Sequence, residues 1–214
     1  MPSYARTERA ALADLLDRVG PDAPTLCAGW TTRDLAAHLV IRERRPDSGL
    51  GLVLKPFAGH TERVLKARAA RPYEETVDLV RNGPGRLSFF GIPGVDAAAN
   101  TMEYFVHLED VRRAQPDFTA RELEPGLTEF LWKRVRGGAK LMLRKVPVGV
   151  SLLRTDTSGE AEPVRVRKGE PVVTIAGPPG ELLLFVYGRK DQALVTVDGD
   201  ADAVRKLRET PTGI

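Results

Sequence analysis

The chain of 214 residues contains a single cysteine, Cys27, and only three histidines. One cysteine excludes an intramolecular disulfide and any zinc or iron–sulfur site that needs several cysteines. It is typical of a protein from a reducing compartment. Every apolar run is far shorter than the roughly 20 residues of a membrane helix, and the first residues turn acidic and amphipathic, unlike a secretory signal. We therefore expect a cytoplasmic protein with no membrane partner.

The sequence also lacks a large excess of charge of one sign. Its 32 basic and 29 acidic residues give a net charge of +3, which does not favour a dedicated nucleic-acid-binding protein. Aromatic residues are 6% of the chain, so base stacking has little support. One basic run without an intervening acid is interpreted as the outward face of a helix: Lys133, Arg134, Arg136, Lys140 and Arg144.

The hydrophobic period changes near Pro147. Upstream, helical spacing predicts main helices over 3–19, 31–45, 96–113 and 125–145, with shorter helices over 61–70 and 73–81. Downstream, short segments alternate between strand and helix patterns: strands over 149–154, 164–167, 172–176 and 193–197, and helices over 181–187 and 200–208. We predict a mainly α fold, with a four-helix bundle over residues 1–147 followed by a small α/β domain over residues 148–214.

The helix over 31–45 has a clear start signal. Thr31 is suited to cap the helix, with Asp34 three residues later as an acidic variant of the capping box. Trp30 and Leu35 flank the cap as a hydrophobic staple. His38 follows within this helix, among small and apolar residues. A lone histidine in such a position more often belongs to the core than to a metal site.

The helix over 96–113 carries a polar stripe on an otherwise apolar sequence. Steps of three and four residues join its members: Asp96, Asn100, Glu103, His107 and Asp110. A surface helix of a globular protein normally shows the reverse pattern, an apolar stripe on a polar background. The pattern predicts that this polar face lines an internal cavity.

Glu103 and His107 have the i, i+4 spacing at which one helix offers two ligands to one metal ion. A carboxylate oxygen and an imidazole nitrogen both suit Zn²⁺ or a related ion. Asp110 is placed to orient His107 or to meet a substrate. A solvated face with a Glu–His hydrogen bond has the same spacing, so this pair alone leaves both interpretations open. With His38 there would be three ligands and an open position, which is typical of catalytic metal sites.

Two segments together resemble a known family: Cys27-x-x-Trp30-Thr31-x-x-Asp34-Leu35-x-x-His38-Leu39 and Glu103-x-x-x-His107-x-x-Asp110. They are similar to the DinB/YfiT-like superfamily and, within it, to actinobacterial proteins with the N-terminal domain of mycothiol-dependent maleylpyruvate isomerase. Residues 176–189 resemble the small α/β domain that follows in that family. The resemblance implies an up-and-down bundle with His38, Glu103 and His107 as ligands of a divalent metal, zinc or nickel.

The resemblance further implies a metal-dependent enzyme that uses a low-molecular-weight thiol such as mycothiol. The metal would lower the pKa of that thiol, which would add to an electrophilic small molecule for isomerisation or S-transfer. Two alternatives remain open. One is a metal-dependent hydrolase in which Asp110 is the base for a metal-activated water. The other is a non-catalytic regulatory module that binds a metal or another ligand.

Further candidates lie outside the ligand set. Arg42 and Arg45 follow His38 by one and two turns, where either could bind a carboxylate of the thiol cofactor or the substrate, or simply complement the helix dipole. Arg189 is a candidate catalytic residue by family analogy. Cys27 lacks a neighbouring base in the sequence and is interpreted as a small packing residue. The segment 47–59 has no assigned role, and the oligomeric state is not predicted.

Overall fold

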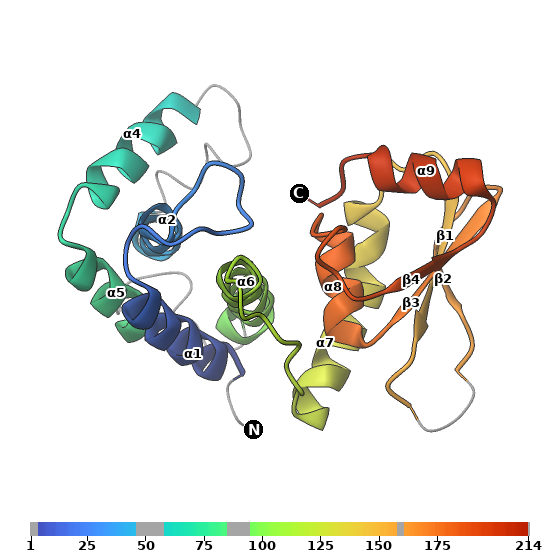
Figure 1. The fold of residues 1–214 in the computed structure, drawn as a ribbon, viewed down its shortest axis with the longest axis horizontal. Coiled ribbons are helices and arrows are strands. Elements are labelled where there is room, and N and C mark those ends of the chain that lie inside the picture. The colour runs from blue at the N-terminus through green and yellow to red at the C-terminus, as the bar shows by residue number, and fades with distance from the viewer. Residues whose placement is uncertain (1–3, 46–57, 85–94, 158–160, 214) are drawn as a thin grey trace. The chain divides into compact units, whose positions relative to one another are not determined.

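The structure is a computed structural model that describes residues 4–45, 58–84, 95–157 and 161–213, with only the backbone described at 58 and 95–99. It forms two compact units, Met1–Ala120 and Arg121–Ile214 (Figure 1). No helix among the described residues is long and apolar enough to cross a membrane. The segment 47–59 lies almost entirely outside the described residues.

The first unit is helical, and its described part consists of five helices (Figure 1): α1 (Tyr4–Val19), α2 (Thr32–Arg44), α4 (Ala58–Ala69), α5 (Tyr73–Asn82) and α6 (Val95–Arg112). α1 packs on α5 and α6, and α2 packs on α4 and α5. The shared core is built from apolar positions three and four residues apart, such as Leu12, Leu16, Leu35, Leu39 and Leu108. The mainly helical fold expected from the sequence is confirmed.

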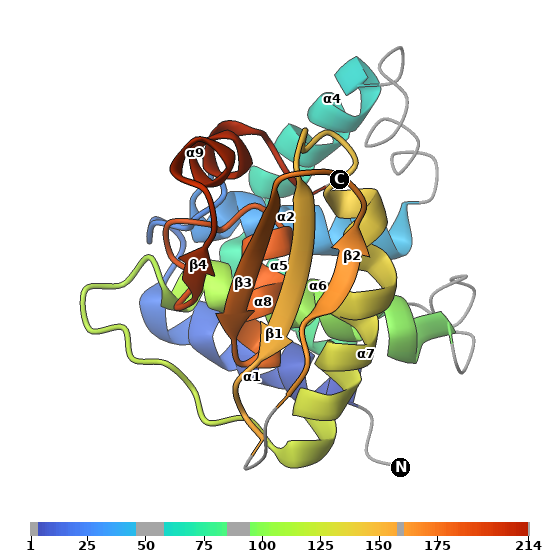
Figure 2. The same ribbon diagram turned by 90° about the vertical axis from the view of Figure 1, so that its right-hand side faces the viewer.

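The second unit combines α7 (Pro125–Met142), α8 (Pro179–Val186) and α9 (Ala201–Glu209) with a four-stranded sheet. The strands are β1 (Gly149–Arg154), β2 (Val164–Arg167), β3 (Val172–Gly177) and β4 (Thr196–Asp198), in the order β2-β1-β3-β4. β1 is parallel to β3, while β2 and β4 pair antiparallel at the two edges. α7 and α8 lie against one face of this sheet (Figures 1 and 2).

The boundary between the units differs from the predicted division at residue 147, because α7 belongs to the second unit. Leu127, Leu131, Val135 and Ala139 form its buried stripe, which packs toward α8 and β2. An apolar stripe of this period fits a bundle partner and a sheet-covering helix equally well. The basic residues Lys133, Arg134, Arg136 and Lys140 are exposed on α7, as predicted.

A buried lysine links two parts of the second unit. Lys190 lies just after α8 in the sequence. Its Nζ donates to the carbonyls of Leu207, Arg208 and Thr210, at 2.7, 3.2 and 2.5 Å. These carbonyls lie at the end of α9, where the last carbonyls of a helix lack partners within the helix. A cation there also complements the helix dipole. The burial of Lys190, which is 9% exposed, is compensated in this way.

Candidate metal centre

The site is built from two helices of the first unit. α2 supplies His38, and α6 supplies Glu103 and His107, which lie one turn apart on the same face. The Nε2 atoms of His38 and His107 lie 3.4 and 3.3 Å from Oε1 of Glu103. The two imidazole rings meet edge to face, with centroids 5.5 Å apart. The three residues predicted as ligands therefore converge.

The donor set fits a divalent metal. One donor atom from each of the three side chains lies within 4.8 Å of the other two. Two ligands bound tetrahedrally at roughly 2.1 Å from zinc are about 3.4 Å apart, which matches the Nε2–Oε1 separations of 3.3 and 3.4 Å. Two imidazoles and one carboxylate would leave one tetrahedral position for an exogenous ligand.

Asp110 is hydrogen-bonded to the ring nitrogen of His107 that does not face Glu103. Its Oδ2 lies 2.9 Å from Nδ1 of His107, and its side chain is fully buried. A carboxylate on Nδ1 sets the tautomer that presents Nε2 to a metal, as in carboxylate–histidine–zinc arrangements. The same Oδ2 accepts a hydrogen bond at 3.3 Å from the thiol of Cys27. Cys27, His107 and Asp110 thus form a second group of potential metal ligands beside the first.

A cation approaches the same carboxylate oxygen of Glu103. Nε of Arg42 is 3.3 Å from Oε1 of Glu103, and its Nη1 donates to Oδ1 of Asn100 at 2.6 Å. Asn100 in turn donates to Glu43, whose Oε1 also accepts hydrogen bonds from Arg9 and Tyr104, each at 2.7 Å. This buried network orients Arg42 toward the centre.

The protonation states follow from burial and these partners. Burial lowers the pKa of His38, so its imidazole is neutral near pH 7, as a metal ligand must be. Burial also acts to lower the pKa of His107, but hydrogen bonds with Asp110 and Glu103 outweigh it and hold that pKa well above the usual value. For Glu103, burial acts to raise the pKa, but hydrogen bonds from His107 and His38 keep it well below the usual range. A metal ion would take the place of the His107 proton.

The other predicted site residues lie in different places. Arg45 lines a separate pocket with residues of α4. It caps α2 with φ −128° and ψ 76°, so helical spacing no longer governs the direction of its side chain. Arg189 is in the second unit, where its Nη1 donates to the carbonyl of Tyr187 at 2.7 Å. The side chain of Asp96, the first member of the polar stripe, is outside the described residues, whereas Asn100 and Asp110 are fully buried.

Sequence reasoning missed Cys27 as a member of the site. Its sulfur is 4.0 Å from Nδ1 of His107, although the two residues are 80 positions apart. It also packs on the bundle core, as expected for a small residue at a helix entrance. Trp30 was interpreted only as a staple, yet its ring contacts the His38 ring at a centroid distance of 5.2 Å. The family pattern that begins at Cys27 was the only feature of the sequence that could have placed Cys27 and Trp30 at the site.

Residues 5–50 match the family model described as "Mycothiol maleylpyruvate isomerase N-terminal domain". This range contains Cys27 and His38 but not Glu103 or His107. Two solved structures are similar over 99% of this chain and 93% of their own chains, both at 15% sequence identity. They are a histidine-to-alanine mutant of the mycothiol-dependent maleylpyruvate isomerase, with a TM-score of 0.56, and the isomerase itself, with 0.54.

No curated protein matches the chain by sequence. The family model supports the resemblance inferred from the sequence over residues 5–50, and the fold is confirmed by the solved structures. The chain therefore carries the sequence pattern of the mycothiol maleylpyruvate isomerase N-terminal domain over residues 5–50 and has the fold of that isomerase along its length.

Proposed function

We propose that the chain is a metal-dependent enzyme of the mycothiol-dependent maleylpyruvate isomerase type. It uses a divalent metal, zinc or nickel, on His38, Glu103 and His107, and it acts on an electrophilic small molecule with a low-molecular-weight thiol as cofactor. The observation that carries the proposal is the convergence of two imidazole nitrogens on one carboxylate oxygen at metal-ligand spacing. When bound, the metal lowers the pKa of a coordinated thiol and makes it nucleophilic near pH 7.

The charges around the centre favour an anionic fourth ligand. With neutral imidazoles, the carboxylates of Glu103 and Asp110 balance a dication, and Arg42 adds a positive charge beside Glu103. A nearby cation stabilises a thiolate relative to a thiol. Arg42 is also the candidate residue for a carboxylate of the cofactor or substrate, because its guanidinium already lies at the centre.

The hydrolase alternative has less support. It needs Asp110 as a base for water, but the Asp110 carboxylate is fully buried and is hydrogen-bonded to His107 and Cys27. We assign Asp110 a positioning role, in which it acts through His107. Arg189 stays a candidate catalytic residue by family analogy alone. Replacing Arg189 with alanine tests this role and should lower turnover while metal content stays unchanged.

The first experiment is metal analysis of the purified, untagged protein beside a variant with both His38→Ala and Glu103→Ala. We expect about one equivalent of divalent metal in the parent protein and a loss of metal in the variant. The parent should then isomerise maleylpyruvate only when mycothiol and the metal are both present. Absence of metal from the parent, even after incubation with zinc, would rule out the proposal.

A second experiment tests the thiol directly. The protein is loaded with Co²⁺, and mycothiol is added while sulfur-to-cobalt charge-transfer absorption is recorded. Because Cys27 could itself supply sulfur, the measurement is repeated with Cys27→Ala. A band that requires added thiol and persists in this variant supports a thiol cofactor. Metal binding without that band or any turnover would favour the regulatory module.

A further inference from the structure

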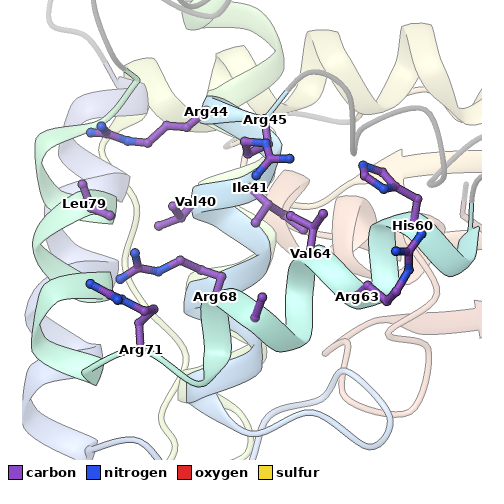
Figure 3. Close-up of a pocket in the computed structure, with 11 residues that line it drawn as sticks. Val40, Ile41, Arg44, Arg45, His60, Arg63, Val64, Arg68, Arg71 and Leu79 are labelled. Carbon is purple, nitrogen blue, oxygen red and sulfur yellow. The ribbon is translucent and has the colours of Figure 1, made fainter.

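A second pocket in the first unit is unusually rich in arginine (Figure 3). It lies between α2, α4 and α5 and has a volume of about 550 Å³. Arg44, Arg45, Arg63, Arg68 and Arg71 line it together with His60, and no acidic residue is among its described lining residues. We call it the arginine pocket. It shares no lining residue with the candidate metal centre, because α2 presents His38 and Arg42 on a different face.

Three of these arginines form a cationic cluster that the described residues compensate only in part, through Glu75. Arg68 directs both Nε and Nη2 at the neutral hydroxyl of Thr76, at 3.1 and 2.7 Å. Burial lowers the pKa of Arg68, the negative charge of Glu75 opposes this, and the charges of Arg71 and Arg44 lower the pKa by smaller amounts. The positive charges therefore repel one another within the pocket, and Glu75 offsets part of that repulsion.

The remaining partners of this cluster are weak or uncharged. Arg44 donates through Nη2 to the carbonyl of Gly83, while its Nε is buried with no hydrogen-bond partner among the described residues. A buried donor without a partner costs free energy unless a ligand satisfies it. The carboxylate of Glu75 lies 3.6 Å from Arg71, which is beyond ordinary hydrogen-bond distance.

The rest of the pocket is apolar. Val40, Ile41, Val64, Ala67 and Leu79 line it between the arginines (Figure 3). Val40 and Ile41 are buried parts of α2, and Leu79 packs on the bundle core. Guanidinium groups around an apolar surface suit a ligand with both an anionic and an organic part. The volume is in the range of roughly 300–1,000 Å³ that is usual for small-molecule sites.

We propose that the arginine pocket binds the phosphate group of a small phosphorylated organic molecule, separately from the metal centre. The planar fork of a guanidinium matches two phosphate oxygens, and several arginines together neutralise a dianion. The organic part of the ligand lies on Val40, Val64 and Leu79. Neither the proposed isomerase reaction nor the metal centre requires this site.

The test is a titration of the methyl-labelled protein with phenyl phosphate, followed by NMR at constant ionic strength. Saturable shifts are expected at Val40, Ile41, Val64 and Leu79, with a Kd of about 1 mM or tighter. Inorganic phosphate should bind about tenfold more weakly, since it lacks the aromatic ring. No saturable shift at roughly 10 mM phenyl phosphate, or equal affinity for the two probes, would overturn the proposal.

Variants locate the binding site. Arg44→Gln should weaken phenyl phosphate at least about tenfold, because it removes a charged donor. Arg71→Gln, at an exposed residue, should also weaken it and does not threaten folding. Arg6→Gln, an exposed charge on α1, is the matched control and should leave affinity unchanged. Equal effects of the pocket and control variants would mean nonspecific charge attraction and contradict the site.

A last variant separates this pocket from the metal centre. Phosphate also binds metals, so the titration is repeated with the His38→Ala and Glu103→Ala double variant. Unchanged affinity supports the arginine pocket whether or not the proposed enzyme function is correct. Loss of binding in this variant would assign the anion to the metal centre and overturn the inference.

Discussion

Nδ1 of His107 and Oδ2 of Asp110 are 2.9 Å apart, three residues along one helix, and the carboxylate is fully buried. This pair fixes the ring of His107 so that Nε2 faces Oε1 of Glu103, the oxygen that Nε2 of His38 also approaches. A ligand held in this way needs less reorganisation to bind metal, and its basicity is raised by the carboxylate. The pair therefore allows a test of the candidate centre that leaves His38, Glu103 and His107 in place.

Asp110→Asn should weaken metal binding by about 10- to 100-fold, because the amide keeps the shape of the carboxylate but not its charge. Affinity is measured by competition with a chromophoric chelator, and folding is checked by circular dichroism. Asp117→Asn, at an exposed position, is the control and should bind metal like the parent. Parental affinity in the Asp110 variant would show that His107 does not depend on this carboxylate.

Glu43→Ala should destabilise the protein by about 3–5 kcal/mol, because it leaves the Arg9 cation buried without its carboxylate. Arg9 and Glu43 are joined at 2.7 Å, and their side chains are only 7% and 2% exposed. Urea unfolding gives the free energy. Asp14→Ala, which removes an exposed partner of Arg81, should cost less than about 1 kcal/mol. Similar costs for both variants would contradict a role for burial.

Asp34→Ala should cost about 1 kcal/mol, because this carboxylate holds the first turn of α2. It accepts hydrogen bonds from the backbone N–H of Thr31 at 3.1 Å and from the Thr31 hydroxyl at 3.2 Å. The measurement is again urea unfolding, with Asp22→Ala at a nearby exposed site as control. A cost no larger than that of the control would mean that the capping interaction contributes nothing measurable.

Tyr73 should make stability fall at high pH. Its hydroxyl donates to the carbonyl of Leu16 at 3.0 Å, and burial raises its pKa from 10.0 to about 12. The folded state favours the neutral phenol, so this stability is complete below pH 10 and is lost between pH 10 and about 12. We expect a loss of about 1–2 kcal/mol, after allowance for partial solvent screening.

Tyr73→Phe isolates this effect, because other tyrosines and lysines also titrate in the same range. The free energies of unfolding of parent and variant are compared from pH 8 to pH 12. Their difference should shrink as Tyr73 ionises in the unfolded chain. A difference that stays constant across this range would show that the pKa of Tyr73 is not raised in the folded protein.

Features determined by neighbouring residues could be predicted from the sequence. The start of α2 depends on Thr31 and Asp34, which are three residues apart, and its predicted start differs by one residue from the helix observed, Thr32–Arg44. The polar stripe of α6 follows from helical spacing alone, so the i, i+4 spacing was enough to pair Glu103 with His107. The meeting of these residues with His38 was inferred from residue type and family resemblance.

Features that depend on distant packing could not be predicted. Cys27 reaches Asp110 across 83 positions, and no local period encodes that contact. The assignment of α7 to the second unit depends on which apolar surface its stripe covers. The stripe alone does not determine that surface. Arg45 has non-helical backbone angles, so its side chain does not point where helical spacing predicted. The network around Glu43 likewise joins three separate segments of the chain.

The hydrogen bonds of Lys190 bear on how the chain folds as it is synthesised. The first unit, Met1–Ala120, is continuous in sequence, so all of its partners have been made once residue 120 has left the ribosome. The hydrogen-bond partners of Lys190, the carbonyls of Leu207, Arg208 and Thr210, are instead synthesised after it. Until those residues emerge, the second unit cannot bury this cation together with its hydrogen-bond partners. Synthesis therefore favours completion of the helical unit first and of the sheet-containing unit last.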